Sequence, residues 1–257
     1  MNYDAFMEPV TWFFTGMEKH SDEYLEGQLG NADSFFGSMR YHMCAFMESS
    51  LLCSMNQLSN HDHSRFLTRT NHRTGRLTDY DYDAASEGVD PAVMREAVLL
   101  QMTWPGAPTL YYGDEAGLTG FTDPDNRRTY PWGKEDRQML TFHKSVITMH
   151  KEHPVLKTGS IKFLGGGYQY LAYARFDEKE QIACLFNNGP EEIQVTVPVW
   201  TAGVSTDSTM TRIFLTDARS WTTKRKAFRV CRGELTLVMG PRSGMVLSSQ
   251  WGKTPAP

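Results

Sequence analysis

The stretch LLCSMNQLSNHDHSRF, residues Leu51–Phe66, joins a short apolar run directly to a dense group of polar side chains. An apolar run that ends in polar residues is typical of a buried parallel strand whose carboxyl end delivers side chains to a site. A second run of this kind, TLYY at residues 109–112, is followed by the carboxylates of Asp114 and Glu115. The two runs therefore predict two strands of an α/β domain.

Helical patterns lie before, between and after these two predicted strands. Apolar residues recur at helical spacing in four stretches, residues 6–17, 31–50, 90–104 and 134–154. Asp90 followed by Pro91 is a strong start signal, because aspartate caps the first backbone N–H groups and proline fits the first helical position. Helices that alternate with strands in this order indicate βα units and a parallel sheet.

The spacing of apolar residues changes after Pro154. Short and often alternating apolar runs, such as YQYLAYARF at residues 168–176 and QIACLFN at residues 181–187, are separated by Gly, Asn, Asp and Pro. This pattern is typical of antiparallel strands and predicts a β-sandwich or a similar all-β module. We therefore expect an α/β domain over residues 1–153 and an antiparallel β-sandwich over residues 154–257.

Composition excludes several classes of partner. The 257 residues carry a formal net charge of −4 and the 26 lysines and arginines are scattered, so nucleic acid is not an expected ligand. No apolar stretch approaches the roughly 20 residues that a membrane helix needs, so no membrane association is expected.

Cysteine usage and the first residues bear on the cellular compartment. The four cysteines form no CxxC pair, which argues against a zinc ribbon and a disulfide framework. They are Cys44, Cys53, Cys184 and Cys231. Their spacing is compatible with buried free thiols in a reducing compartment. The first residues, MNYDAFMEPVTWFF, have neither a basic region nor a cleavage-site pattern, so a cytoplasmic protein is expected.

The polar group Asn60–His63 allows several interpretations. Two histidines flank Asp62, but no third ligand stands at a recognised spacing, so a metal is not expected. A Ser/His/Asp nucleophilic site would need a nucleophile elbow, and the sequence has no G-x-S-x-G. A further interpretation is that His61 and Asp62 cap the next helix. The position just past a strand favours a binding cleft, in which Asp62 accepts hydrogen bonds from substrate hydroxyls beside His61.

Two further groups of polar residues follow the second predicted strand. Asp114 and Glu115 are adjacent, so their side chains diverge on an extended chain, and structural carboxylates at the strand exit are the favoured interpretation. Asp123 and Arg127 lie four residues apart in the loop TDPDNRRTYPW. Charge-assisted bonds to sugar hydroxyls and a salt bridge that stiffens the loop are equally good interpretations of this pair.

The stretch DYDYDAASEGVD, residues 79–90, imitates part of a calcium-binding loop. Its sixth position is Ala84 where such loops have glycine, and its twelfth is Asp90 where they have glutamate. Calcium is therefore not indicated, and no cofactor is expected.

Several of these stretches together resemble the α-amylase superfamily, glycoside hydrolase family 13. NHD at Asn60–Asp62 resembles the fourth sequence region of the family, and PGAPTLYYGDEAGLTGFTDPDNRRTYPWGKED, residues 105–136, resembles its eighth strand and the following loop. MNYDAF at residues 1–6 is similar to the stretch after the general-acid region, and residues 140–156 resemble the last barrel helix leading into domain C. The DPDNRR wording is most similar to the neopullulanase, cyclomaltodextrinase and maltogenic-amylase branch.

This resemblance implies a fold and a chemistry. The fold is a (β/α)8 TIM barrel followed by an antiparallel domain C, and the reaction is retaining hydrolysis of α-glucosidic bonds in maltooligosaccharides, cyclodextrins, pullulan or starch. By the resemblance, Asp62 is the transition-state stabiliser that holds ring hydroxyls at the cleavage point, with His61 and Asn60 beside it. Asp123 and Arg127 hold the next glucose unit.

The chain departs from the family pattern at the two residues that carry the chemistry. The nucleophile of the family lies in a G-x-R-x-D stretch and the general acid in a glutamate region, and neither occurs here; TGRLTD at residues 74–79 has the wrong spacing. A complete barrel takes about 250 residues, and about 150 precede the all-β part. We therefore expect the C-terminal portion of an enzyme, from the end of the sixth strand onward, with the missing regions before Met1.

This expectation has consequences for activity and association. Without nucleophile and acid, the chain alone should not turn over a glycoside. An incomplete barrel leaves strand edges and apolar surface open, so self-association through the exposed barrel edge is expected. The alternative is a non-catalytic α-glucan-binding or scaffold remnant of the same family, which would keep the cleft wall without the chemistry.

Overall fold

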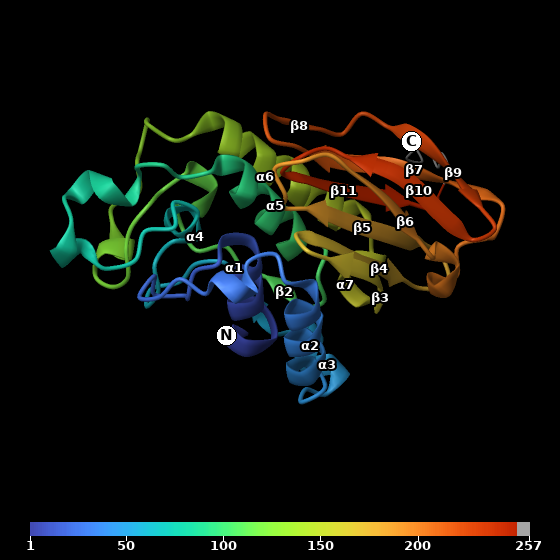
Figure 1. Cartoon of the computed structure of the whole chain (residues 1–257), viewed down its shortest axis with the longest axis horizontal. Coiled ribbons are helices and arrows are strands. Elements are labelled where there is room, and N and C mark those ends of the chain that lie inside the picture. Colours follow the sequence, from blue (N-terminus) through green and yellow to red (C-terminus); the bar gives the residue numbers. More distant parts are fainter. Residues whose placement is uncertain (251–257) are drawn as a thin grey trace.

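The computed structural model of the chain describes residues 1–250. Figure 1 shows helices and loops from the first part of the sequence on one side and a large antiparallel sheet from the last part on the other. None of the helices in this described range has the length and apolar character required to cross a membrane.

Each of the four predicted helical stretches contains an α-helix of the described chain, whereas two further short α-helices, at residues 66–69 and 155–158, were not predicted. The α-helices are α1 (Glu8–Thr15), α2 (Ala32–Met43), α3 (Glu48–Leu52), α4 (Phe66–Arg69), α5 (Pro91–Gln101), α6 (Arg137–Glu152) and α7 (Val155–Thr158). Short helical turns add η1 (Tyr3–Met7), η2 (Glu26–Gln28), η3 (Leu77–Asp79), η4 (Tyr82–Ala85), η5 (Asp114–Ala116), η6 (Asp125–Arg127) and η7 (Val199–Ala202). The second predicted helix is shorter than expected, because the chain leaves α2 in a tight turn in which Phe46 N–H bonds to Met43 O (3.1 Å).

Side-chain caps set the starts of the three longest helices. Asp90 accepts hydrogen bonds from the N–H groups of Ala92 (2.8 Å) and Val93 (3.4 Å), with a proline in the first helical position, as predicted. Asn31 and Asp136 cap α2 and α6 in the same way. Each cap satisfies backbone donors that have no partner inside the helix.

A small parallel sheet is formed by β1 (Met55–Asn56) and β2 (Ala107–Pro108), and α5 lies in the connection between them. The backbone N–H of Asn2 bonds to Met55 O (3.0 Å), so the start of the chain lies along the other edge of β1. This unit has the predicted βα arrangement, but the first predicted strand is reduced to two residues, because Leu51 and Leu52 at the start of its apolar run belong to α3.

The strand that TLYY predicts lies two residues earlier in the structure, at β2. Its pairing with β1 ends at Thr109, whose N–H bonds to Asn56 O (2.8 Å). The chain then turns around the guanidinium of Arg65, which lies over the rings of Tyr111 (4.5 Å) and Tyr112 (4.9 Å). None of the four TLYY residues lies in β2, so the predicted position of this strand is wrong.

The remaining strands form one nine-stranded sheet with antiparallel pairings. They are β3 (Ser160–Gly167), β4 (Tyr170–Phe176), β5 (Gln181–Asn187), β6 (Ile193–Val197), β7 (Ser208–Thr216), β8 (Trp221–Thr222), β9 (Lys226–Cys231), β10 (Glu234–Met239) and β11 (Ser243–Ser248). Their order is β3–β4–β5–β11–β7–β9–β10–β6, with β8 beside β7.

This continuous sheet confirms the predicted antiparallel all-β module, whereas the finer prediction of a β-sandwich stays a prediction. The turn η7, which follows β6, contacts β3 and β4, so the two ends of the strand order approach each other and the sheet takes a barrel-like shape. A register shift between Val246 and Leu247 interrupts the pairing of β11 with β7, and such irregularities increase local twist. Alternating apolar runs predict strands but do not distinguish one curled sheet from two facing ones.

Alternate residues of one strand face two different cores. In β4, Leu171 and Tyr173 pack with the helices, whereas Ala172 and Ala174 line the interior of the curled sheet. Figure 1 shows α5 and α6 lying against the sheet. The helices and the outer face of the sheet therefore share one apolar core.

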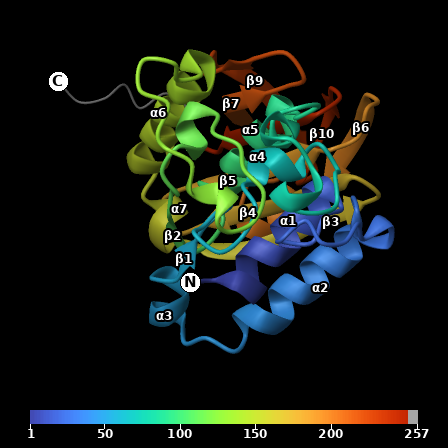
Figure 2. The ribbon, with the colours of Figure 1, turned by 90° about the vertical axis from the view of Figure 1, so that its left-hand side faces the viewer.

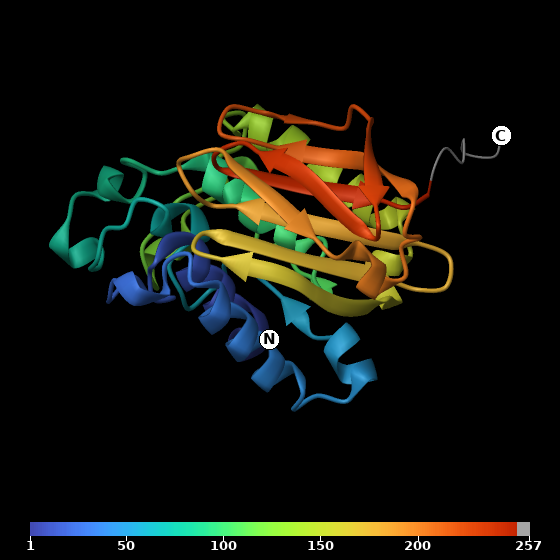
Figure 3. The same cartoon turned by 45° about the vertical axis from the view of Figure 1, so that its right-hand side comes forward.

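Helix α2 packs against α1 on one side and along the edge strand β3 on the other (Figures 2 and 3). Phe36 stacks on Phe163 with 4.3 Å between ring centroids. At Gly166, an added Cβ would lie only 2.7 Å from the Cβ of Ala32. The helix and the strand therefore close on each other in the middle, and a cavity lies at each end of their contact.

The cysteines only partly match the expectation of buried thiols. All four are free, and Cys184 is buried in the shared core, but the other three are exposed. They are Cys44, Cys53 and Cys231. Cys44 and Cys53 lie between the end of α2 and β1, in a segment whose residues are half-buried or exposed.

Candidate functional site

The loop after β1 is shaped by the side chain of Asn60. Its Oδ1 accepts hydrogen bonds from the N–H groups of Asp62 (2.9 Å) and His63 (3.1 Å), and its Nδ2 donates to Tyr3 Oη (3.2 Å). A side-chain oxygen that bonds the backbone two residues on makes a tight local turn. The buried Asn60 therefore fixes the backbone from which the next two side chains project.

His61 and Asp62 project from this turn into solvent. Their atoms Nε2 and Oδ1 lie 3.3 Å apart, and both side chains are about half exposed. The interpretation that they cap the next helix is wrong: α4 begins after Arg65, and no side chain caps it. Both groups are therefore open to a ligand.

A second loop, residues 122–127, lies against the first. Arg127 Nε is 2.8 Å from Asp123 Oδ1, and the same nitrogen donates to His61 O (3.0 Å). The Asp123 N–H approaches Asp62 O at 3.4 Å, and the Asp123–Pro124 peptide is cis. The predicted loop-stiffening salt bridge is therefore confirmed. Because both of its side chains remain about half exposed, the sugar-contact interpretation of the same pair stays a prediction.

Residues that the sequence did not indicate hold these two loops together. Thr122 Oγ1 donates to Asp62 O (2.7 Å), and His20 Nδ1 lies 2.8 Å from the same hydroxyl. The ring of His63 packs edge-to-face between His20 (4.5 Å) and Tyr3 (5.2 Å). No spacing rule finds such partners, since they come from separate segments.

His63 is buried in this cluster rather than free in the loop. Burial lowers the pKa of His63 to about 3, and the positive charge of Arg69 acts in the same direction. The imidazole is therefore neutral at physiological pH and serves as a packing surface beneath the Asp62 loop.

A buried ion pair between Arg65 and Asp114 packs beneath the surface of the two loops. Arg65 Nη1 lies 3.0 Å from Asp114 Oδ1, and Arg65 also donates to Tyr112 O (2.8 Å) and Asn126 O (2.9 Å). Burial raises the pKa of Asp114 to about 6, although Arg65 opposes the shift. Glu115 accepts from the Gly113 N–H (2.9 Å). The predicted structural role of the two adjacent carboxylates is therefore confirmed.

Metal ligands are not gathered anywhere in residues 1–250: no group of three or more His, Cys, Asp or Glu side chains is placed to hold an ion. In the calcium-like stretch, Asp79 Oδ2 is instead bonded to the Arg76 N–H (2.7 Å) at the start of η3.

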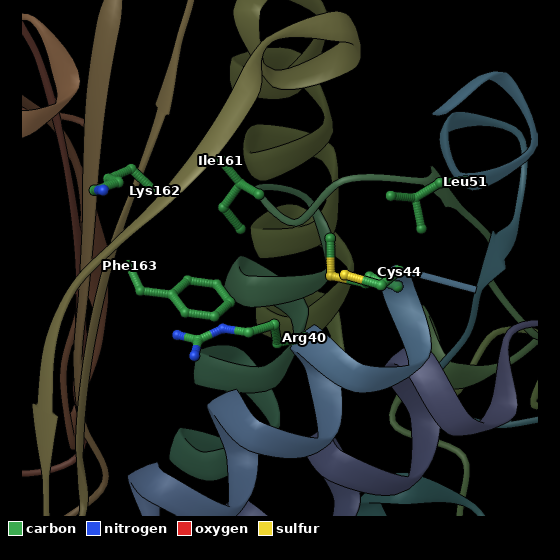
Figure 4. Close-up of a pocket in the computed structure, with 7 residues that line it drawn as sticks. Arg40, Cys44, Leu51, Ile161, Lys162 and Phe163 are labelled. Atoms are coloured by element: carbon green, nitrogen blue, oxygen red, sulfur yellow. The ribbon is translucent and has the colours of Figure 1, made fainter. Parts of the chain in front are cut away.

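Two other features of the molecule lack the arrangement that a catalytic site needs. The cavity of about 450 Å³ between α2, α3 and β3 is lined by Arg40, Met43, Cys44, Leu51, Ile161, Lys162 and Phe163 (Figure 4). No carboxylate is among these residues, so the cavity cannot supply the acid and nucleophile of glycoside hydrolysis.

The second feature is a group of the residue types found in nucleophilic triads. His153 Nδ1 lies 2.8 Å from Glu180 Oε1, and Ser248 Oγ donates to that same oxygen. Because the serine bonds the carboxylate and not the imidazole, His153 is not placed to act as the base of a nucleophilic triad.

Polar loops at the carboxyl ends of adjacent parallel strands are the arrangement of α/β-barrel enzymes. Comparison with known proteins narrows this class. The family described as alpha amylase, catalytic domain, matches residues 28–157. An amylopullulanase from Thermoanaerobacter thermohydrosulfuricus is 32% identical over 212 residues, which cover 78% of this chain and 13% of that protein.

Two further likenesses extend over nearly the whole chain. Neopullulanase 2 from Thermoactinomyces vulgaris is 28% identical over 253 residues, covering 96% of this chain and 36% of that protein. The solved structure of a cyclomaltodextrinase matches with a TM-score of 0.70 and 26% identity, covering 97% of this chain and 36% of that one. The chain belongs to the α-amylase family, glycoside hydrolase family 13, which confirms the resemblance. It spans only 13% to 36% of the length of these relatives.

Proposed function

We propose that this chain forms one wall of the active-site cleft of a retaining α-glycosidase that acts on maltooligosaccharides, cyclodextrins, pullulan or starch. In this proposal its α/β part belongs to a (β/α)8 barrel, and Asp62 stabilises the transition state with His61 and Asn60 beside it. Asp123 and Arg127 hold the next glucose unit. The names of the relatives, amylopullulanase, neopullulanase and cyclomaltodextrinase, support the substrate class.

The observation that carries the proposal is the single hydrogen-bonded array on the two loops. Asp62 and Asp123 present half-exposed carboxylates, and Arg127 ties both loops together through His61 O. Carboxylates that accept from sugar hydroxyls form charge-assisted hydrogen bonds, which are stronger than neutral ones. A ligand with several hydroxyls on one edge fits such an array.

Catalysis needs more than this wall. Retaining hydrolysis uses two carboxyl groups about 5 Å apart across the scissile bond. Asp123 is engaged by Arg127, and Asp114 is buried against Arg65, so neither is placed to act opposite Asp62. We therefore expect binding by this chain alone without turnover.

Calorimetric titration of maltoheptaose into the 257-residue chain tests the binding role of Asp62. Asp62→Asn keeps the shape of the side chain and removes its charge, so the affinity should fall about tenfold or more. Asp207→Asn makes the same chemical change on an exposed aspartate of the all-β part and should leave the affinity unchanged. Equal affinities for the Asp62 variant and the wild type would refute the proposed site.

The activity of the same preparation provides the second test. No glucose or maltose should be released from maltooligosaccharides, and robust release would contradict the proposal that the acid and nucleophile are absent. The coding sequence upstream of Met1 separates an enzyme portion from a non-catalytic α-glucan-binding remnant. An in-frame G-x-R-x-D with a glutamate region supports the enzyme, and stop codons there support the remnant.

A further inference from the structure

A cavity of about 310 Å³ lies where the start of α2 meets the turn between β3 and β4. Its lining comes from residues 26–33 and 166–168 and shares no residue with the two loops described above. We call it the Tyr168 cavity. Pockets that hold small ligands have volumes of about 300–1,000 Å³, so this one has room for one or two sugar rings.

The ring of Tyr168 is exposed, but the backbone that carries it is fixed. Its side chain is 76% exposed. The residue pairs with Asn31 in an isolated antiparallel bridge, and the next residue, Gln169, donates to Gly30 O (2.6 Å) and accepts from the Asn188 N–H (2.8 Å). A flat apolar ring on a fixed backbone is a prepared stacking surface, because little freedom is lost when a ligand covers it.

Two carboxylates stand beside this ring without partners of their own. Glu26 and Asp33 line the cavity and are exposed. None of the ion pairs among residues 1–250 uses either of them. Both are therefore available as acceptors for hydroxyl groups.

The charge of the lining excludes other ligand classes. No lysine, arginine or histidine is among the lining residues, so a phosphate or another anion would face the negative charges of Glu26 and Asp33 without a cationic side chain to balance them. The ligand that fits is a neutral ring with hydroxyls along its edge and C–H groups on its face. A glucose unit has both features.

Glycines keep the floor of the cavity open. A Cβ added at Gly27 or Gly167 would meet no atom within 4 Å, so the space above both backbones is empty. Asn31 Nδ2 donates to Gly27 O (3.1 Å) and holds that segment in place. The floor of the cavity therefore leaves space for a ligand, and a hydrogen bond holds its backbone in place.

We propose that the Tyr168 cavity is a second α-glucan binding site, in which a glucose unit stacks on Tyr168 and its hydroxyls bond to Glu26 and Asp33. This inference rests on the proposed function, because the same polymer would occupy both sites. The site would anchor a distant part of a long glucan while another part occupies the cleft beside Asp62.

Calorimetric titration of maltoheptaose into the full chain and its variants tests this site. In the Asp62→Asn variant a residual binding event should remain, and adding Tyr168→Ala should weaken that event about tenfold. Asp33→Asn should weaken it as well. Tyr41→Ala is the matched control for Tyr168→Ala. Tyr41 is 78% exposed on α2, the helix that carries Asp33, but it lies outside the cavity lining.

The outcomes separate this site from the cleft. Loss of all binding in Asp62→Asn, or residual binding that Tyr168→Ala leaves unchanged, overturns the second site while the proposed cleft stands. If the affinity for maltoheptaose is unchanged by Asp62→Asn but falls in the Tyr168→Ala variant, the second site is supported and the proposed cleft is refuted. An equal loss in the Tyr41 and Tyr168 variants also overturns the second site, because the effect would then not be specific to the cavity.

Discussion

Asn60 and Thr122 show how single polar side chains shape a site that no short motif describes. Asn60 folds its own loop by accepting from the N–H groups two and three residues on. Thr122 holds Asp62 O from 60 residues away, and His20 reaches the same hydroxyl across 102 residues of sequence. The orientation of Asp62 therefore depends on neighbours that only folding brings together.

Glu96 is a buried carboxyl group whose ionisation bears on the stability of the fold. It lies on α5, fully buried, and neither carboxylate oxygen has a hydrogen-bond partner among residues 1–250. Burial raises the pKa of Glu96 well above its ordinary 4.5; Asp90 adds to the shift, and Arg242 and Arg95 oppose it. The side chain is therefore held in its neutral form at a pH where an exposed glutamate is ionised.

Replacement of Glu96 should reverse a pH-dependent loss of stability. The folded protein holds this proton more tightly than the unfolded chain, so the contribution of Glu96 to stability falls as pH rises from 4.5 toward the raised folded pKa. Glu96→Gln keeps the shape and cannot ionise, so it should gain about 1–3 kcal/mol over the wild type at pH 8 and much less at pH 5. Urea unfolding at the two pH values measures the difference.

The exposed Glu178 provides the control for this variant. Glu178→Gln removes the same charge from a surface turn and should leave the pH dependence of unfolding unchanged. Parallel stability curves for Glu96→Gln and the wild type between pH 5 and pH 8 would show that the buried carboxyl does not titrate as described.

At the scale of elements, α5 links the two layers of the molecule. It lies in the connection between β1 and β2 and also packs against β7 and β11 of the large sheet. Arg95 on this helix donates to Thr216 Oγ1 (3.1 Å) and to Asp217 O (2.9 Å) at the end of β7. Loss of α5 would therefore destabilise both the small parallel sheet and the large antiparallel sheet.

The cap of α5 gives a prediction at this scale. Asp90→Ala removes the acceptor for the N–H groups of Ala92 and Val93, and it should cost about 1 kcal/mol and lower Tm by about 2–4 °C. Asp90→Asn keeps an acceptor at the same place and should behave like the wild type. Thermal unfolding followed by circular dichroism compares the three proteins, and an unchanged Tm in Asp90→Ala would contradict the assigned cap.

At the scale of the whole molecule, the small parallel sheet is the open side of the structure. Among residues 1–250 this sheet has two strands, β1 and β2, with Asn2 bonded to the outer edge of β1, and the segment around α3 exposes large apolar side chains next to them. Met47 is 78% exposed, and Phe46 and Met55 are also exposed. Apolar surface beside a short sheet is a surface at which chains associate.

We expect self-association through this open side. Sedimentation velocity of the wild type should show an average mass that rises with concentration, and Met47→Lys together with Met55→Lys should restore the monomer. Val238→Lys introduces the same charge at an exposed apolar position of β10 and should not. A wild-type chain that stays monomeric over the whole concentration range would count against the exposed edge.

Local sequence signals predicted the helices and strands more accurately than they predicted the contacts between these elements. Asp90, Pro91 and the apolar spacing of α5 fixed a helix start correctly, because a cap acts within three residues. The strand predicted at TLYY lies at Ala107–Pro108 instead, and Tyr112 of TLYY contacts Arg65, more than forty residues earlier in the chain. In the candidate site, the motifs found Asn60, Asp62 and the Asp123–Arg127 pair but missed His20 and Thr122.

Local patterns in the sequence were enough to predict the four longer helical stretches with the cap of α5, the run of antiparallel strands and the resemblance to the α-amylase family. These features depend on the spacing of residues within one segment or on motifs whose residues are contiguous in the sequence. The tertiary structure alone decided that the strands form one curled sheet, that Glu96 is buried without a partner and that the residues around Tyr168 enclose a cavity. The physical reason is that burial, sheet closure and cavities arise between segments far apart in the chain, where local pattern carries no information about distance.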